Sequence, residues 1–454
     1  MGEPSGFTLP ESLDLREFVV ATYLYRVAAG VDIHHAAADL AEMQSTGTWV
    51  ALERETQAIR ERHGARVVAI WEVPEPEDGV PVDRDLREWV VQIAYPSHNI
   101  GAQIPLLLAT VYGECASVGD IKLIDLHLPE AFVAAFKGPK FGLDGVRQLV
   151  GATDRPLLIT MLKPALGLTP KESAEVFYQA AIGGSDAVKD DELLVSHPWS
   201  HFLDRVREHE RAAQAAFDET GHRTLYFVNI TDRPDRLVQN AYRAIEAGAS
   251  ALMVDYLTVG ISALSMLADD PAIAVPILGH LAFAGAMSAS PRNGVGSHLV
   301  LGKLPRLAGA DTVVYPSPYG TLRFSRSEHL RLARTMTDPF HDVRPMLPTP
   351  GGGLHAGMVP RLSADLGIDY AVGAGGAVHG HPMGAAAGAR AIRQAIDATI
   401  RGESLADARV DEPELAAALD TWPEEPIDRG ADRAVGIDER AFMNQPVRPE
   451  ERRR

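Results

Sequence analysis

Short apolar runs recur along the chain from about residue 150 onward, and each is followed by glycine, proline or polar residues and then by a helical stretch. Continuous apolar runs of this length are typical of parallel strands that are buried on both faces. The eight runs begin roughly 25 to 38 residues apart, which is the repeat of strand–helix units. The pattern predicts an α/β fold, an eight-stranded (β/α)8 TIM barrel, with a doubly wound sheet as the alternative. The runs cover residues 156–162, 186–188, 224–230, 251–256, 276–281, 312–315, 345–348 and 371–374.

Residues 1–145 mix helical and strand patterns, and they predict a separate α+β domain before a barrel that covers residues 146–405. The expected elements are a helix over 33–43, strands over 66–72 and 88–94, and two segments, 15–29 and 104–111, that periodicity leaves open between helix and strand. After residue 405 the chain becomes acidic and contains prolines, which predicts a solvated C-terminal tail over 406–454.

Charge and cysteine content narrow the functional classes. The 454 residues include 43 Lys and Arg against 61 Asp and Glu, a formal net charge of −18, which argues against nucleic acid or an anionic membrane as a partner. The single cysteine, Cys115, excludes an intrachain disulfide and a Cys-rich zinc site, and it fits a reducing cytoplasm.

No signal-peptide pattern opens the chain. The most apolar long stretch, 272–289, contains proline, glycine and histidine and is interpreted as barrel interior rather than a membrane span.

The run 186–188 ends in Lys189, Asp190, Asp191 and Glu192, at the end of a strand where barrels carry their function. Consecutive carboxylates suit a hard cation such as Mg²⁺, which prefers oxygen ligands. An uncharged lysine amine can add CO₂ and become a carbamate, so Lys189 could supply a third oxygen ligand. The alternative is a solvated turn before a helix that begins at Glu192.

Two further side chains at expected strand ends could transfer protons. Lys163 follows the run 156–162 and could act as acid or base beside a metal, or could extend its ammonium to solvent from a structural position. His280 ends the fifth run and ranks above His355, His379 and His381 as a proton carrier, although a structural histidine is the commoner case.

Two glycine clusters follow the last two runs and predict a phosphate site, because loops at these positions of a barrel bind phosphate through exposed backbone N–H groups. The candidate positions are Gly352 and Gly353 after the seventh run and Gly375 and Gly376 after the eighth. In the N-terminal domain, Thr48 and Trp49 lie in a polar turn, for which a surface role is the simpler interpretation.

These pieces, in this order, resemble the large subunit of ribulose-bisphosphate carboxylase (RuBisCO) over about residues 15–400, and the segment 183–192 is the most specific match. The resemblance implies a ferredoxin-like domain followed by the barrel, in an obligate dimer with shared active sites. It implies that Lys189 is carbamylated and binds Mg²⁺ together with Asp191 and Glu192, and that Lys163 moves substrate protons. It also implies that Thr48 and Trp49 reach the barrel of a partner subunit, and that the glycine pairs bind phosphate.

The sequence departs from the carboxylases in several places. Thr321 stands where they carry the mobile lysine that holds CO₂, and the groups for a second phosphate are missing. The other replacements are Ala165, Gly351, Leu281, Val314, Met43 and Thr110. A buried dianion without its cationic partners is strongly disfavoured. The chain therefore resembles the RuBisCO-like proteins of form IV and is not expected to fix CO₂.

The resemblance implies a Mg²⁺-dependent enzyme that forms an enolate or enediolate from a monophosphorylated keto-sugar, by isomerase, enolase or decarboxylase (transcarboxylase) chemistry. One alternative is the 2,3-diketo-5-methylthiopentyl-1-phosphate enolase of methionine salvage. In those enolases an N-terminal lysine is the base, whereas this chain has Tyr112, Gly113 and Glu114 there, so Glu114 would have to substitute. A non-catalytic relic with a regulatory or scaffold role is the other alternative.

Overall fold

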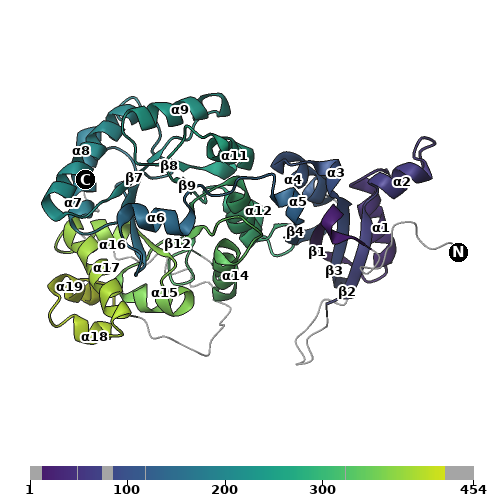
Figure 1. Cartoon of the computed structure of the whole chain (residues 1–454). Coiled ribbons are helices and arrows are strands. Elements are labelled where there is room, and N and C mark those ends of the chain that lie inside the picture. Colours follow the sequence, from purple (N-terminus) through teal and green to yellow (C-terminus); the bar gives the residue numbers. More distant parts are fainter. Residues whose placement is uncertain (1–12, 49, 74–84, 118, 323, 425–454) are drawn as a thin grey trace, which may run out of the picture.

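A computed structural model describes residues 13–48, 50–73, 85–117, 119–322 and 324–424. It contains an N-terminal α+β domain that lies beside a closed barrel (Figure 1). Within the described ranges, none of the helices has the length and apolar character needed to cross a bilayer.

The N-terminal domain has the order β-α-β-β-α-β with an antiparallel sheet of order β4-β1-β3-β2, which is the predicted ferredoxin-like arrangement. The two segments left open by periodicity are now resolved: 15–29 contains a strand and 104–111 lies in a helix. In the core, the Tyr23 hydroxyl in the first strand donates to the Val111 carbonyl at 2.5 Å. The elements are β1 (Phe18–Ala28), α1 (Ile33–Met43), α2 (Gln57–His63), β2 (Arg66–Glu72), β3 (Leu86–Pro96), α3 (Ser97–Ile100), α4 (Ile104–Tyr112) and β4 (Asp120–His127).

The barrel is closed by eight parallel strands, and each of the eight apolar runs overlaps one of them. This confirms the TIM barrel and excludes the doubly wound sheet. In chain order the strands are β5 (Leu157–Met161), β6 (Ala187–Lys189), β7 (Leu225–Asn229), β8 (Ala251–Val254), β9 (Ile277–Gly279), β11 (Thr312–Pro316), β12 (Leu347–Gly351) and β13 (Ala371–Ala374). The outer helices are α7 (Pro170–Ile182), α8 (Phe202–Thr220), α9 (Pro234–Glu246), α10 (Tyr256–Val259), α11 (Ile261–Asp269), α13 (Leu304–Ala308), α14 (Arg326–Thr337), α15 (Val359–Leu366) and α17 (Ala385–Ile400).

Side chains of the barrel strands alternate between two buried clusters, because successive residues of a strand point to opposite faces. In β5, Leu157, Ile159 and Met161 belong to the cluster inside the barrel, whereas Leu158 belongs to the cluster between strands and helices. In β6, Ala187 belongs to the inner cluster and Val188 to the outer one. This alternation decides which residues at a strand end can reach the barrel mouth.

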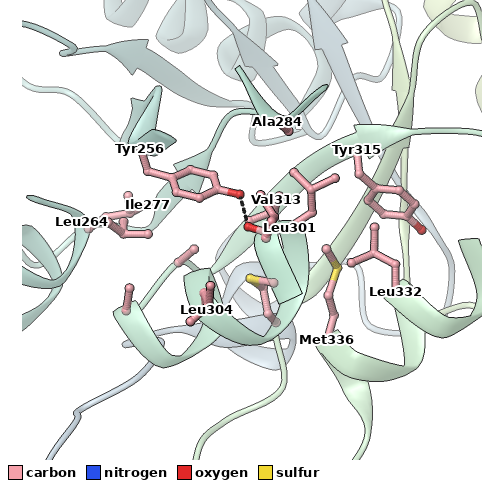
Figure 2. Packing of buried hydrophobic residues seen from close by; sticks show 14 of the residues in the cluster. Tyr256, Leu264, Ile277, Ala284, Leu301, Leu304, Val313, Tyr315, Leu332 and Met336 are labelled. Carbon is pink, nitrogen blue, oxygen red and sulfur yellow. Dashed lines mark hydrogen bonds between the residues drawn. The ribbon is translucent and has the colours of Figure 1, made fainter. Parts of the chain in front are cut away.

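The connection after β9 is more complex than a single helix. The chain forms α12 (Ala284–Ser288), a short strand β10 (Gly294–Val295) and a π-helical turn (Leu299–Lys303) before α13. β10 pairs in parallel with β4, so the barrel domain adds a fifth strand to the N-terminal sheet. Figure 2 shows the π-helical turn between barrel strands and helices, where the Tyr256 hydroxyl donates to the Val300 carbonyl at 2.7 Å. The two domains are thus joined by shared structure as well as by the chain.

Two of the predicted boundaries are wrong. The boundary at 145/146 falls inside α6 (Gly142–Val150), whose Leu143, Val146 and Val150 pack into the inner cluster of the barrel. The tail expected from residue 406 instead contributes to two helices, α18 (Leu405–Ala408) and α19 (Pro413–Thr421), and α19 packs against α17. Leu415 is 0% exposed, so residues 405–421 belong to the folded barrel domain. The many acidic residues of this segment hid the few apolar residues that α19 buries, which are Leu415, Ala418 and Leu419.

Substitution of Leu415 tests this correction. Leu415→Ala should lower the free energy of unfolding by about 2–5 kcal/mol, because it removes buried methyl groups and leaves a cavity. Val410→Ala is the control, since Val410 lies nearby and is 79% exposed. Urea unfolding followed by circular dichroism measures both changes. Equal stabilities of the two variants would contradict the packing of α19.

Candidate active site

The end of β6 separates its charged residues by strand alternation. Asp190 points outward and is fully buried against α8: Arg205 donates to its Oδ2 through Nε at 3.1 Å and Nη2 at 3.0 Å, and the Tyr226 hydroxyl donates to Oδ1 at 2.7 Å. The backbone N–H of Asn229 also donates to Oδ2, at 3.0 Å. All of these contacts point away from the barrel mouth, so Asp190 is a structural anchor, whereas Lys189 and Asp191 lie on the inner side.

Lys189 is a buried amine among carboxylates. It is 1% exposed, and its Nζ donates to the Asp190 carbonyl at 2.9 Å. Burial lowers the pKa of Lys189, although the charges of Glu192, Asp191 and Asp255 oppose this shift. The amine therefore gives up its proton more readily than a surface lysine does. The neutral amine that results is the form that reacts with CO₂.

Asp191 is joined to Lys163 across the mouth. Lys163 follows β5 and donates from Nζ to Asp191 Oδ2 at 2.7 Å, and the side chain of Lys163 is 44% exposed whereas that of Asp191 is 3% exposed. Burial alone would raise the pKa of Asp191, but the hydrogen bond from Lys163 and the N–H of Leu193 lower it. The predicted proton carrier and one predicted metal ligand are thus in direct contact.

His280 follows β9 and lies between two carboxylates. Its Nε2 is 3.5 Å from Glu192 Oε2, and its Nδ1 is 3.7 Å from Asp255 Oδ1. The Ala282 N–H donates to Nδ1 at 3.2 Å, so the proton of the neutral ring resides on Nε2, which faces Glu192. Burial, followed by the charges of Lys189 and Lys163, holds the pKa of His280 well below its usual range. His280 is therefore a neutral donor at the mouth.

Asp255 and Asn229 are site residues that the sequence analysis missed. Asp255 follows β8, is 5% exposed, and has an Oδ1 atom without a hydrogen-bond partner in the described part of the chain. Burial raises its pKa to about 6. Asn229 ends β7 and donates from Nδ2 to the carbonyls of Glu192 at 3.2 Å and Asp191 at 3.4 Å. Each is the polar residue next to the end of an apolar run, 224–230 or 251–256, and this position at a strand end is the signal that could have revealed them.

The predicted metal ligands fit an ion only if Lys189 takes part. Among the described residues, no three His, Cys, Asp or Glu side chains are grouped so that they could hold a metal ion. Asp191 and Glu192 supply two carboxylates, and a carbamate on the buried amine of Lys189 would supply the third oxygen donor. The donor set is thus suited to a hard divalent cation after modification of Lys189.

The two glycine turns follow adjacent strands, since Gly351 of β12 pairs with Gly373 of β13. Gly352 and Gly353 have φ values of +89° and +82°, which non-glycine residues rarely adopt. Among the described residues, none accepts a hydrogen bond from the N–H groups at 352, 353, 375 or 376. A Cβ atom on Gly375 would lie 3.6 Å from Lys163 Cγ, so this turn borders the proton carrier.

The N-terminal candidates do not reach the barrel mouth of their own chain. Glu114 is exposed in a short 3-10 helix after α4, and Thr48 is half-buried after α1. No hydrogen bond or ion pair between described residues joins either of them to the barrel mouth, and the N-terminal domain lies to one side of the barrel (Figure 1). Trp49 lies outside the described residues. A role for these residues in catalysis requires a second copy of the chain.

The closed barrel, the buried lysine at its mouth and the neighbouring acids and second lysine agree with the resemblance to RuBisCO. The family comparison agrees: the ribulose bisphosphate carboxylase large chain, catalytic domain, matches residues 142–422, and the N-terminal domain of the same chain matches residues 13–132. The chain therefore belongs to the RuBisCO large-chain family, which confirms the resemblance seen in the sequence.

Several of its relatives within the family are RuBisCO-like proteins. The chain is 45% identical to a ribulose bisphosphate carboxylase-like protein of Archaeoglobus fulgidus over 394 residues, which are 87% of this chain and 90% of that protein. It is 40% identical to a 2,3-diketo-5-methylthiopentyl-1-phosphate enolase of Geobacillus kaustophilus over 405 residues, which are 89% and 98% of the two chains. The crystal structure of a rubisco-like protein (MtnW) from Alicyclobacillus acidocaldarius superposes with a TM-score of 0.82 at 38% identity and covers 89% of this chain and 100% of that one. The chain is a RuBisCO-like enzyme.

Substitution of the two neighbouring aspartates tests their assignment. Asp190→Asn should lower the free energy of unfolding by about 3–5 kcal/mol, because it leaves the charge of Arg205 buried without its partner. Asp191→Asn, at the mouth, should lower stability less than Asp190→Asn does, because its partner Lys163 is 44% exposed, and it should abolish the predicted Mg²⁺ binding. Urea unfolding and titration calorimetry measure the two effects. A reversed pattern would show that the inner and outer positions at the end of β6 are misassigned.

Proposed function

We propose that this chain is a Mg²⁺-dependent enzyme that forms an enolate or enediolate from a monophosphorylated ketose or diketone. The observation that supports this most directly is the ion pair between Lys163 and Asp191, beside the buried amine of Lys189. Proton removal next to a carbonyl needs a base and a cation close together, and these residues can provide both.

The metal would be held by Asp191, Glu192 and Lys189, the last as a carbamate that forms when its neutral amine adds CO₂ and releases one proton. Bound Mg²⁺ supplies Lewis-acid polarisation of a substrate carbonyl. Asn229 fixes the backbone of Asp191 and Glu192 through its amide, and Arg205 fixes Asp190, so the ligand positions are supported from behind.

Lys163 would remove the proton next to the substrate carbonyl. Its side chain reaches the open mouth, and its present partner is an oxygen of Asp191 that a metal would also use. Release from that carboxylate, followed by loss of one proton from the ammonium to water, would give the neutral Lys163 amine that can accept the substrate proton. His280, with the proton on Nε2, would donate a hydrogen bond to the oxygen on which negative charge develops.

The phosphate would bind to the backbone N–H groups of Gly352, Gly353, Gly375 and Gly376, of which Gly375 borders Lys163. The other end of the substrate would be uncharged. Leu281, Val314 and Thr321 stand where a bisphosphate or CO₂ would need cationic or polar partners, and Val314 is buried in the inner cluster. A monophosphate therefore fits this mouth, and carboxylation of a bisphosphate does not.

The active enzyme would be a homodimer or a multiple of dimers. Thr48, Trp49 and Glu114 belong to the N-terminal domain and are candidates to complete the mouth of a second copy's barrel. Glu114 would be a carboxylate base, or a hydrogen-bonding group for the substrate, at the place where the salvage enolases have a lysine.

Within the enolate-forming class, the methionine-salvage enolase is the favoured specific activity. The enolase from Geobacillus kaustophilus aligns over 98% of its length. The isomerase and decarboxylase chemistries of the resemblance would use the same metal site and the same lysine, and a non-catalytic relic would use neither.

The experiment follows deuterium exchange by proton NMR. The enzyme, with Mg²⁺ and bicarbonate in D₂O, is given 2,3-diketo-5-methylthiopentyl 1-phosphate, methylthioribulose phosphate and oxo-isoapionate phosphate in turn. Exchange or conversion of one of them supports the enolate assignment and identifies the substrate. Absence of exchange in all three, together with absence of Mg²⁺ affinity, would favour the relic. Label from bicarbonate entering phosphoglycerate in the presence of ribulose bisphosphate would contradict the interpretation of Thr321.

Substitution of Lys189 tests the metal site. Lys189→Ala should weaken Mg²⁺ binding in bicarbonate buffer by at least about 100-fold, because the third oxygen donor is lost. Titration calorimetry measures the affinity, and circular dichroism shows whether the variant is folded. Lys171→Ala, on the exposed start of α7, is the control and should bind as the wild type does. Unchanged affinity of Lys189→Ala would reject the carbamate.

Substitution of Lys163 separates proton transfer from metal binding. Lys163→Met should slow deuterium exchange by roughly 10² to 10⁴, the usual contribution of a general base. Mg²⁺ affinity should be kept or increased, because Asp191 loses a competing cation. Lys171→Met is the matched control. If Lys163→Met exchanged deuterium at the wild-type rate, Lys163 would not be the base, and Glu114 or His280 would be the next candidates.

A further inference from the structure

The segment between β11 and α14 lies directly on the glycine turn after β12. The N–H of Ser317 donates to the Gly351 carbonyl at 2.9 Å, and the N–H of Thr321 donates to the Gly352 carbonyl at 2.9 Å. The contact is so close that a Cβ atom on Gly320 would lie 1.8 Å from the Gly352 oxygen. Residues 316–322, which we call the β11 loop, therefore form one wall of that turn.

The β11 loop is held from outside by one tyrosine. The Tyr319 hydroxyl donates to Asp365 Oδ2 at 2.5 Å, and Asp365, on α15, has a side chain that is 2% exposed. The other oxygen of Asp365 accepts from Arg326 of α14, through Nε at 3.0 Å and Nη2 at 2.6 Å. The Arg361 guanidinium stacks over the Tyr319 ring at 4.6 Å. One buried carboxylate thus joins the loop, α14 and α15.

The turn beneath the loop needs such support. Gly352 and Gly353 follow each other with positive φ, and a glycine pair loses much conformational freedom when it is fixed in one geometry. The loop covers both residues: a Cβ atom on Gly352 would lie 3.0 Å from Leu322 Cδ1, and one on Gly353 would lie 2.7 Å from Thr321 Cγ2. Loss of the outer anchor would let the loop and the turn fluctuate together.

The anchor holds in ordinary buffers because Tyr319 keeps its proton. Burial, followed by the hydrogen bond to Asp365, raises its pKa to about 12. The other titratable groups near Asp365 are Arg326, which is paired with it, and the buried phenol of Tyr315. His329 lies 3.9 Å from Oδ2, and burial lowers its pKa to about 4, so it is neutral. A phenol that donates to a carboxylate is among the stronger hydrogen bonds of proteins.

We propose that Tyr319, through Asp365, is a positioning residue that keeps the Gly352–Gly353 turn in its phosphate-binding conformation. This proposal rests on the phosphate site of the proposed function and assigns the residue that preforms it. It also gives the β11 loop a role that needs no lysine: the loop acts as a fixed wall of the phosphate site.

Tyr319→Phe tests the role, because it removes one hydroxyl and keeps the ring over Arg361. The dissociation constant of inorganic phosphate, measured by ³¹P NMR, should rise roughly tenfold. Amide hydrogen exchange at Thr321 should become faster by about the same factor, since its N–H bonds to Gly352. Tyr242→Phe is the matched control, because Tyr242 on α9 donates to Asp270 in the same kind of phenol–carboxylate contact away from the mouth. It should leave both values unchanged.

The outcomes separate the two proposals. If wild-type protein binds no phosphate, the phosphate site fails and the positioning role fails with it. If wild-type protein binds phosphate but Tyr319→Phe shows the wild-type dissociation constant, with or without faster exchange at Thr321, the positioning role alone is overturned. Weaker phosphate binding in Tyr319→Phe, faster exchange at Thr321 and an unchanged Tyr242→Phe would support both.

Discussion

The strict alternation of side chains along β6 is the constraint on which the site depends. It sends Val188 and Asp190 toward the helices and Ala187 and Lys189 into the barrel. Arg205 then neutralises Asp190 in the outer layer, so that of three consecutive acids only Asp191 and Glu192 remain for the mouth. A shift of one residue along β6 would turn Lys189 toward the helices and Asp190 into the barrel. The buried Asp190–Arg205 pair thus fixes which residues of β6 face the proposed metal site.

The remainder of the mouth is built from neighbouring strand ends and is supported from outside. Lys163 from β5 meets Asp191, His280 from β9 faces Glu192, and the glycine turn after β13 lies beside Lys163. The β11 loop, anchored by Tyr319, packs over one of these turns. The proposed chemistry follows from this arrangement, in which the candidate base, the candidate metal ligands and the candidate phosphate turns follow strands of the same barrel.

Much of this could be predicted from the sequence, because buried parallel strands are continuous apolar runs and the functional residues follow them. The misses have physical reasons. Asp255 was hidden because it was included in the run 251–256, and β10 is only two residues long, too short for any periodicity. Burial of α19 depends on a narrow apolar stripe in an acidic segment. The Tyr319–Asp365 contact joins residues 46 positions apart, which no local pattern reveals.

The most direct test of the account is ¹³C NMR of the protein with Mg²⁺ and ¹³C-labelled bicarbonate. We expect a carbamate resonance that is stabilised by Mg²⁺, absent from Lys189→Ala and weakened in Asp191→Asn. Enolisation of substrate by wild-type protein without any such resonance would contradict the central claim that Lys189, Asp191 and Glu192 form one metal site.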